Sequence, residues 1–289
     1  MKVLLAGEID APWRHALAAA MPEAVWLEHG DDARAAVVAN PAPGALAGLP
    51  ALGLIQSLWA GVDGLLRDAT LPPQVPIARM VDPVMTAAMA ETALWAVLSL
   101  HRRFFDYAQQ QRTGRWRQHM QRRADEVAVL VLGQGEMGRA AAARIAALGY
   151  GVSAWRRGVP LTPLLAQAEI VINLLPLTEK TSGILNSALF AALPRQAALV
   201  NLGRGAHLNE ADLLAALDAG HLRHAVLDVF AVEPLPAAHA FWHHPKITLL
   251  PHAAALTDAR SAAAVAAANL RALRDGRPLA HLVDRSRGY

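Results

Sequence analysis

Residues 127–158 read VAVLVLGQGEMGRAAAARIAALGYGVSAWRRG, and they decide the fold of this chain. The stretch begins with an unbroken apolar run that ends at Leu132, which is typical of a strand buried on both faces of a parallel sheet. A glycine-rich turn, an alanine-rich segment to about Leu148 and a second apolar run over residues 152–155 follow. This order predicts a strand, a helix and a second strand in a parallel β-α-β unit.

The glycine-rich turn, GQGEMG, matches the G-x-G-x-x-G pattern of dinucleotide-binding proteins. Gly133 permits the tight turn, Gly135 lets the backbone approach a pyrophosphate, and Gly138 lets the helix pack closely on the strand. Glu136 and Met137 begin the helix, whose free N–H groups and positive dipole end suit phosphate. The same six letters can occur in an ordinary loop. The flanking strands and helix make dinucleotide binding the better interpretation.

Composition places the chain among globular proteins of about two domains. It has 289 residues, 54% of them apolar and 18% charged, which leaves ample core and argues against disorder. Charged residues interrupt every apolar run before it reaches the length of a membrane span, and no long basic run accompanies the net charge of +3. We therefore expect neither a membrane nor a nucleic acid as partner. The absence of cysteine excludes disulfides and thiolate metal sites and is compatible with a reducing cytoplasm, where we expect the protein.

The first part of the chain alternates short strand-like and helix-like segments, which predicts a small open α/β domain. One strand ends in Trp59-Ala60-Gly61, which is either a simple strand-to-helix turn or a loop whose backbone N–H groups hold a carboxylate. An apolar, helix-like segment runs from about Met85 to Gln111. We predict one long helix there that connects two domains.

Three chemically active side chains follow three later strands. Arg204 comes after residues 197–201, and Glu233 and His252 follow the next two strands along the chain. Each has an ordinary alternative: a solvated turn, a loop cap and a structural histidine. Because ligands of an open parallel sheet lie outside the carboxyl ends of its strands, the three together predict an active site beside the dinucleotide.

The motifs GQGEMG, LLPLT, NLGRG, LDVFAVEPLP and PHAAA, in this order, resemble the D-isomer-specific 2-hydroxyacid dehydrogenase family. The resemblance covers nearly all of the chain from SLWAGVD onward, and HRRFFDY and VDRSRGY resemble the glyoxylate/hydroxypyruvate reductase branch. It implies an α/β protein of two Rossmann-like open parallel-sheet domains. The substrate domain would be discontinuous, residues 1–95 plus 258–289, with the dinucleotide-binding domain, residues 96–257, inserted. A homodimer formed through residues 104–123 is also implied.

The resemblance further implies the reaction and the residue roles. Family members reduce a 2-keto acid to a 2-hydroxy acid by hydride transfer from a nicotinamide. His252 would protonate the carbonyl oxygen, and Glu233 would favour the protonated imidazole. Arg204 would hold the substrate through its planar guanidinium group. Further contacts are implied for the substrate, from Trp59, Ala60 and Gly61, and for the cofactor, from Leu174, Pro176 and Asp228.

The end of the second strand of the β-α-β unit bears on the choice of cofactor. NAD-binding proteins carry an acidic residue there, which binds the ribose hydroxyls. This chain has Trp155-Arg156-Arg157 instead, and two guanidinium groups suit a 2′-phosphate. We therefore predict NADP, with NADPH preferred over NADH and NAD still possible, against the alternative of a solvated basic turn. The connection that follows, GVPLTP, is shorter than in the family and would leave the adenosine pocket more open.

Three functions remain open at this point. The first is NADPH-dependent reduction of small 2-keto acids, glyoxylate to glycolate and hydroxypyruvate to D-glycerate. The second is the same reaction on a bulkier 2-keto acid, and the third is a nucleotide-sensing interaction protein on the same fold. A metal site at His239, His243 and His244 is not expected, because neither carboxylate nor cysteine accompanies them in the sequence.

Overall fold

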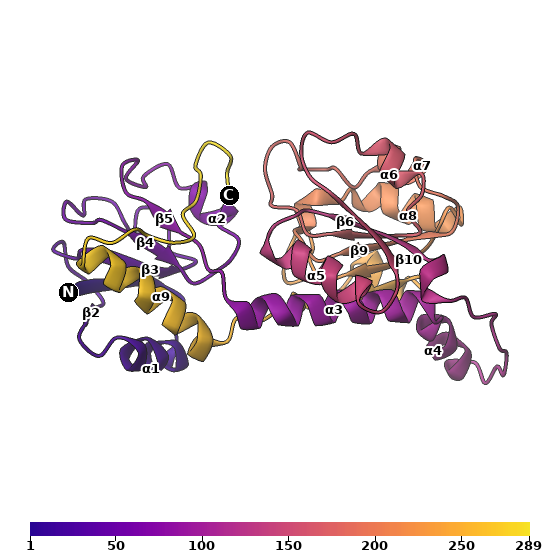
Figure 1. Cartoon of the computed structure of the whole chain (residues 1–289), viewed down its shortest axis with the longest axis horizontal. Coiled ribbons are helices and arrows are strands. Elements are labelled where there is room, and N and C mark those ends of the chain that lie inside the picture. The colour runs from indigo at the N-terminus through magenta and orange to yellow at the C-terminus, as the bar shows by residue number, and fades with distance from the viewer. The chain divides into compact units, whose positions relative to one another are not determined.

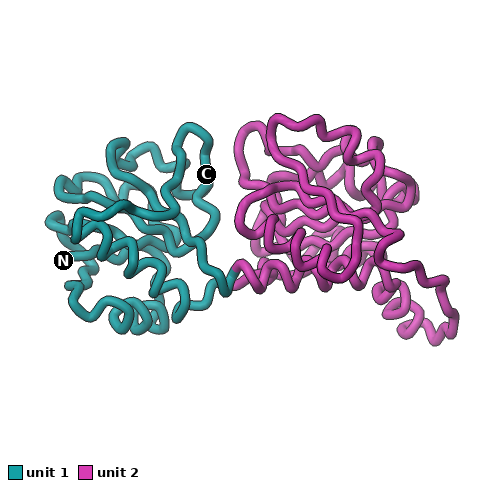
Figure 2. Tube along the Cα trace, in the orientation of Figure 1, with its two compact units in different colours: residues 1–85, 257–289 teal, residues 86–256 magenta.

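Two parallel sheets organise the chain, one in each of two units. The structure is a computed structural model that describes all 289 residues. Unit 1 comprises Met1–Met85 and Thr257–Tyr289, and unit 2 comprises Thr86–Leu256 (Figure 2). The predicted class, two open parallel-sheet α/β domains of which the first is discontinuous, is confirmed. The division falls after residue 85, whereas the sequence led us to expect it near residue 95.

Unit 1 is built on a five-stranded sheet in the order β2-β1-β3-β4-β5, in which every neighbouring pair is parallel. Its strands are β1 (Lys2–Gly7), β2 (Val25–Leu27), β3 (Ala35–Ala39), β4 (Ile55–Ser57) and β5 (Ile77–Ala78). Its helices are α1 (Ala11–Ala20), α2 (Asp63–Leu66) and α9 (Ala259–Arg274). Helix α9 lies beside α1, and the C-terminal tail pairs with β5 through an antiparallel bridge between Ala78 and Leu282 (Figure 1). The last residues of the chain therefore complete the unit that the first residues begin.

Unit 2 is built on a six-stranded parallel sheet in the order β11-β10-β9-β8-β6-β7. Its strands are β6 (Ala128–Leu132), β7 (Gly151–Trp155), β8 (Ile170–Asn173), β9 (Ala197–Asn201), β10 (Leu222–Leu227) and β11 (Ile247–Leu249). Its helices are α3 (Pro83–His101, whose first residues belong to unit 1), α4 (Phe104–Arg112), α5 (Glu136–Ala146), α6 (Thr162–Leu165), α7 (Ser187–Ala191) and α8 (Glu210–Asp218). The chain reverses its direction of travel across the sheet between β6 and β8. Ligands of such sheets bind at this point, outside the carboxyl ends of the two strands.

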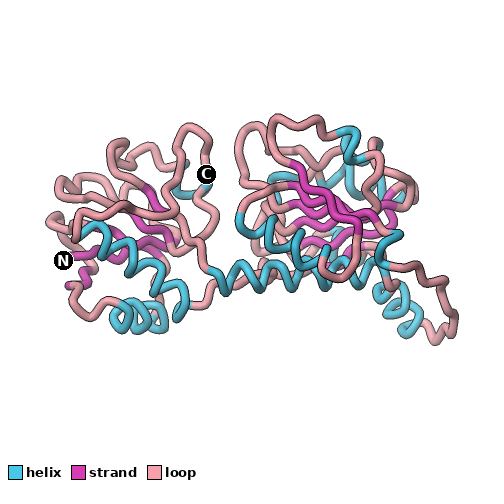
Figure 3. Tube along the Cα trace, viewed as in Figure 1, coloured by secondary structure: helices cyan, strands magenta, loops and turns pink.

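The central strands of unit 2, β6, β8 and β9, are buried on both faces. Helices lie around the sheet (Figure 3). In β6, Val129 and Val131 pack in one cluster with residues of α3 and α5. Leu130 and Leu132 pack on the other face, in a cluster with residues of α7 and α8. Burial of each such side chain contributes about 1.5–3 kcal/mol. This two-sided burial is the reason why the apolar run does not alternate with polar residues.

The prediction of one long helix over residues 85–111 is wrong. Helix α3 ends at His101, and α4 begins at Phe104 after Arg103, which has a left-handed backbone with φ of 63°. The break lets Phe105 stack on the ring of His224 in β10, with ring centroids 4.5 Å apart. Contacts with the sheet, rather than helix propensity, therefore set the end of α3.

Helix α3 is long and apolar enough to cross a membrane by length and composition alone. Its residues Ala93, Ala96 and Val97 are fully buried in the core cluster of unit 2 that includes Val129 and Val131 of β6. An apolar helix that packs on a sheet in this way has the environment of a core helix.

Candidate active site

The glycine turn has the geometry that its pattern predicts. Gly133 has a φ of 111°, and a Cβ atom there would lie 2.7 Å from the carbonyl oxygen of Leu174. A Cβ atom on Gly138 would lie 2.0 Å from the carbonyl oxygen of Gly133. A Cβ atom on Gly135 would meet nothing within 4 Å, so this side of the turn is open. The first and last glycines thus allow close packing, and the middle one leaves room for a ligand at the start of α5.

A basic surface adjoins the glycine turn at the end of β7. The side chain of Gln134 donates a hydrogen bond to the carbonyl of Ala154, 2.9 Å away, and so ties the glycine turn to β7. The indole N–H of Trp155 donates to the carbonyl of Val159 at 2.7 Å and closes the turn that follows. Arg156 and Arg157 lie on this turn and are exposed. The short connection beyond it still contains one helical turn, α6, which was not predicted.

Two of the predicted catalytic residues meet at the carboxyl end of the sheet of unit 2. Nδ1 of His252 lies 2.7 Å from Oε2 of Glu233. The other carboxylate oxygen of Glu233 accepts a hydrogen bond from the backbone N–H of Phe230 at 2.9 Å, which fixes the carboxylate. The side chain of His252 is 53% exposed. A carboxylate on Nδ1 sets the orientation of the ring and leaves Nε2 to carry a proton towards a ligand.

Asp228 braces the loop that carries His252. Its side chain is buried, and its Oδ1 accepts hydrogen bonds from the backbone N–H groups of Ala253 at 2.7 Å and Ala254 at 3.1 Å. Its carbonyl oxygen accepts from the N–H of His252 at 2.9 Å. Burial raises the pKa of Asp228, and the two backbone hydrogen bonds oppose the rise. We did not predict this bracing role, although an acidic residue directly after an apolar strand was a signal for it.

Arg204 lies in the loop after β9 and is partly buried. Its Nη1 donates to the carbonyl of Gly203 at 2.8 Å. Its backbone is held by two side chains. The N–H donates to Nδ1 of His207 at 3.2 Å, and the carbonyl accepts from Nδ2 of Asn201 at 3.1 Å. His207 and Asn201 are fully buried, and the sequence analysis assigned no role to either.

The predicted cofactor contacts Leu174 and Pro176 follow β8 directly. Leu174 lies against the glycine turn, since its carbonyl is the group that a Cβ atom on Gly133 would strike. The carbonyl of Pro176 lies 3.3 Å from Nε2 of His207. The loop after β8 therefore adjoins both the glycine turn and the loop of Arg204.

The predicted substrate residues Trp59, Ala60 and Gly61 belong to unit 1. The backbone N–H of Trp59 donates to Oγ of Ser57 at 3.0 Å, and its ring packs edge to face on Trp13, with centroids 6.1 Å apart. The buried indole N–H of Trp59 has no hydrogen-bond partner. Within unit 1 this loop is thus held by Ser57 and Trp13.

Two of the three histidines considered for a metal lie against carboxylates instead. Nε2 of His239 lies 3.1 Å from Glu210, and Nε2 of His244 lies 3.3 Å from Asp218. His243 ends a short 3₁₀ turn. No group of three or more histidine or acidic side chains in the chain is close enough to hold a metal ion.

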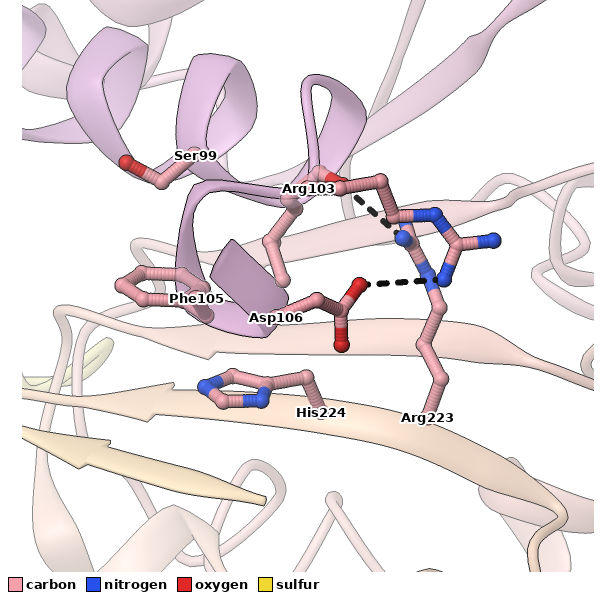
Figure 4. A pocket seen from close by; sticks show the side chains of 7 residues that line it. Ser99, Arg103, Phe105, Asp106, Arg223 and His224 are labelled. Atoms are coloured by element: carbon pink, nitrogen blue, oxygen red, sulfur yellow. Dashed lines mark hydrogen bonds and ion pairs between the residues drawn. The ribbon is translucent and has the colours of Figure 1, made fainter. Parts of the chain in front are cut away.

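A small pocket lies at the opposite end of the sheet, beside the start of β10 (Figure 4). It is lined by Ser99, Leu100, Arg103, Phe105, Asp106, Arg223 and His224. Nη1 of Arg223 donates to the carbonyl of Leu100 at 2.9 Å, and Arg103 pairs with Asp106 at 3.2 Å. Burial lowers the pKa of His224 to about 4. Burial and the neighbouring Arg103 lower the pKa of Arg223 to about 10.

Comparison with known proteins defines the class. A family profile described as D-isomer specific 2-hydroxyacid dehydrogenase, NAD binding domain, matches residues 94–254. The chain belongs to the D-isomer specific 2-hydroxyacid dehydrogenase family and is an NAD(P)-dependent oxidoreductase that acts on a CH–OH group.

The relatives specify the branch. The chain is 40% identical over 300 residues to glyoxylate/hydroxypyruvate reductase A of Serratia proteamaculans, with 96% of each chain covered. It is 39% identical over 272 residues to the protein of the same name from Yersinia enterocolitica, covering 88% of this chain and 87% of that one. The predicted resemblance to this branch is confirmed.

Solved structures agree with this assignment. A D-isomer specific 2-hydroxyacid dehydrogenase from Xanthobacter autotrophicus, in complex with NADPH and MES, has a TM-score of 0.95 and 36% identity, covering 100% of this chain and 99% of that chain. An NADPH-dependent glyoxylate/hydroxypyruvate reductase from Sinorhizobium meliloti, in complex with NADP and sulfate, has a TM-score of 0.93 and 33% identity with the same coverage.

Proposed function

We propose that this enzyme reduces small 2-keto acids with NADPH, converting glyoxylate to glycolate and hydroxypyruvate to D-glycerate. The observation that carries the proposal is the pair of His252 and Glu233, whose Nδ1 and Oε2 lie 2.7 Å apart. The pair lies at the carboxyl end of the sheet that contains β6, the strand that leads into the glycine turn. Relatives named glyoxylate/hydroxypyruvate reductase A support the choice of substrate class.

His252 is the proposed proton donor. The carboxylate of Glu233 stabilises the imidazolium form, and Nε2–H delivers its proton to the carbonyl oxygen as that oxygen becomes an alcohol. Arg204 holds the carboxylate of the substrate with a planar, permanently charged group. The loop of Trp59, Ala60 and Gly61 is a proposed second contact for that carboxylate. A bound nicotinamide would supply the hydride.

The residues of unit 2 fit a dinucleotide. The open side of Gly135 at the start of α5 leaves room for a pyrophosphate, which would accept hydrogen bonds from the backbone of Glu136 and Met137. Leu174, Pro176 and Asp228 are proposed contacts of the nicotinamide half. The proposed dinucleotide-binding domain, expected from the sequence over residues 96–257, corresponds to unit 2. The proposed substrate domain, expected over residues 1–95 and 258–289, corresponds to unit 1.

NADPH is the proposed cofactor because of the turn after β7. Arg156 and Arg157 are exposed there, and no carboxylate occupies the position that binds a ribose hydroxyl in NAD enzymes. Trp155 holds the turn through its bond to Val159. Solved relatives crystallised with NADPH and with NADP support the same choice.

A panel of 2-keto acids tests the proposal, with the absorbance of NADPH or NADH as the readout. We expect turnover of glyoxylate and hydroxypyruvate and a higher kcat/KM with NADPH. A preference for phenylpyruvate or a branched acid would instead support a dehydrogenase for bulkier substrates. Tight NADPH binding without turnover of any acid would support a nucleotide sensor. A higher kcat/KM with NADH would refute the cofactor assignment.

We also propose a homodimer that involves residues 104–123. Trp116 and Met120 in this segment are 95% and 91% exposed, which is unusual for large apolar side chains. Replacement of both by aspartate should convert a dimer to a monomer in light scattering. A wild-type monomer, or a dimer that survives both substitutions, would refute this proposal.

A further inference from the structure

A fully buried polar cluster lies between the loops that follow β8 and β9. It consists of Asn173, the last residue of β8, Asn201, the last residue of β9, and His207, all three with no exposed surface. Burial of a polar side chain costs free energy unless its hydrogen bonds are satisfied. The hydrogen bonds that these three side chains make therefore determine what the cluster does. We propose that His207 is a positioning residue, which sets the place of Arg204 relative to the loop of Pro176. The inference rests on the proposed function, because it concerns the substrate-binding role of Arg204.

The hydrogen bonds of His207 specify a single form of its ring. Nδ1 lies 3.2 Å from the backbone N–H of Arg204 and 2.9 Å from Nδ2 of Asn173. Both partners are donors, so Nδ1 must be the acceptor and carry no proton. Nε2 lies 3.3 Å from the carbonyl oxygen of Pro176, an acceptor, so Nε2 carries the proton. The ring is therefore neutral, with its one hydrogen on Nε2.

The rest of the cluster leaves Asn173 and Asn201 no alternative arrangement. Nδ2 of Asn173 donates to both Oδ1 of Asn201, at 2.9 Å, and His207, while its Oδ1 accepts from the N–H of Leu175 at 3.3 Å. Oδ1 of Asn201 also accepts from the N–H of Gly203 at 3.3 Å, and its Nδ2 donates to the carbonyl of Arg204 at 3.1 Å. Each amide has one orientation that suits its partners.

Arg204 is consequently held on both sides of its peptide backbone. His207 accepts from its N–H, Asn201 donates to its carbonyl, and Nε2 of His207 extends the connection to the carbonyl of Pro176. The position of a guanidinium group depends on the position of the backbone that carries it, because the side chain between them is long. A displacement of about 1 Å at a substrate-binding group can cost about 100-fold in rate. His207 therefore positions Arg204 and does not itself contact the substrate.

The alternative is that His207 merely fills space in the core. Three substitutions of His207 distinguish a positioning role from mere filling of space. The amide oxygen of asparagine lies where Nδ1 of histidine lies, and the amide nitrogen of glutamine lies where Nε2 lies. His207→Asn retains the acceptor for Arg204, His207→Gln retains the donor for Pro176, and His207→Leu retains neither. His221→Leu is the matched control, since Nε2 of His221 also lies close to a backbone carbonyl, that of Phe190 at 2.7 Å, outside the proposed site.

The measurements are KM and kcat for glyoxylate, the Kd of NADPH from fluorescence, and the melting temperature of each variant. We expect His207→Leu and His207→Gln to raise KM for glyoxylate about 10-fold or more, with the Kd of NADPH within about twofold of the wild type. We expect His207→Asn to remain within about threefold of the wild-type KM, even though its stability falls. His221→Leu should lower stability without a change in KM.

Two kinetic outcomes would overturn this inference while leaving the proposed function intact. The first is an unchanged KM in an active His207→Leu enzyme, and the second is an equal rise of KM in all three variants in proportion to lost stability. Imidazole ¹⁵N shifts give a readout that does not require activity. They should show a protonated Nε2 and an unprotonated Nδ1, with the signal identified by its loss in His207→Asn, and the opposite tautomer would also overturn the inference. A wild-type enzyme that reduces no 2-keto acid would instead refute the proposed function, and this inference with it.

Discussion

At the carboxyl end of the six-stranded sheet of unit 2, an arginine, a glutamate and a histidine follow three neighbouring strands. At the amino end, Arg223 and His224 at the start of β10 face Arg103 and Asp106, so this group has similar residue types (Figure 4). A hollow with a charged lining is present at the amino end. Its side chains, however, bind other parts of the fold.

The two ends differ in what the polar groups bind. At the amino end, Arg223 donates to the last turn of α3, and His224 contacts Thr248 through Nε2 at 2.9 Å while its ring stacks on Phe105. These contacts satisfy the carbonyl of Leu100 at the end of α3 and attach α4 to the sheet. At the carboxyl end, one nitrogen of His252 binds Glu233 and the ring is half exposed. Residue type alone does not identify a catalytic group; the orientation of its polar atoms does.

The largest expected effect separates the two histidines. His252→Gln removes the proposed proton donor, and we expect kcat for glyoxylate to fall about 1,000-fold, within the range for loss of a general acid. His224→Gln should leave kcat within about twofold of the wild type, because this ring serves packing and a bond to Thr248. Steady-state kinetics on both variants, with NADPH binding as a check on folding, makes the comparison. Equal losses in the two variants would break the distinction between the two ends.

The two arginines provide the next test. Arg204→Lys should lower kcat/KM about 100-fold, since a point charge cannot reproduce the planar contact with a carboxylate. Arg223→Lys should instead lower the free energy of unfolding by about 1 kcal/mol through a weaker contact with the carbonyl of Leu100. Urea denaturation and kinetics on both proteins measure the two effects. Near-wild-type turnover in Arg204→Lys would remove the proposed role of Arg204.

A pH titration of stability examines the amino end alone. Burial lowers the pKa of His224 from its ordinary value of 6.5 to about 4, so the folded protein favours the neutral ring. The stability that this provides is complete above pH 6.5 and is lost as the pH falls towards 4. Between pH 7 and pH 5 the loss is about 2 kcal/mol.

His224→Gln cannot titrate and should lose correspondingly less stability over the same range in urea denaturation. Burial also lowers the pKa of His101, which gives both proteins a shared background slope. Identical slopes for the two proteins would mean that His224 has the same pKa in the folded and unfolded states, which would contradict its burial.

The smallest expected effect concerns the basic turn after β7. Replacement of Arg156 and Arg157 by alanine should lower kcat/KM for NADPH about 10-fold and leave the value for NADH unchanged, because only NADPH carries the 2′-phosphate. The experiment compares the two cofactors in one variant, so a general folding defect would lower both values. A parallel fall would indicate that the turn is structural, like the arginines at the amino end.

The sequence was informative wherever local pattern determined structure. The apolar run of β6 and the spacing of Gly133 and Gly138 follow from rules that apply within one β-α-β unit. The approach of Glu233 and His252 followed from the rule that parallel strands place their carboxyl ends together.

The features that escaped prediction depend on contacts between distant parts of the chain. Helix α3 ends where it does because Arg223 contacts its last turn and His224 stacks on Phe105 of α4. No local signal marks Arg103 as a left-handed residue. Asn173 and His207 are 34 positions apart and meet only because β8 and β9 are neighbours. Their hydrogen bonds could not be assigned before the order of the strands was known.

The discontinuity of unit 1 has a consequence for biosynthesis. On the ribosome, the first 85 residues emerge long before α9 and the tail that pairs with β5 through Val283 and Ile77. Unit 2, residues Thr86–Leu256, is made in between, which takes about 10–30 s at about 5–20 residues per second. The nascent N-terminal segment therefore stays with α1 and the edge of its sheet uncovered until unit 2 has been made, and unit 2 can fold before unit 1 is complete.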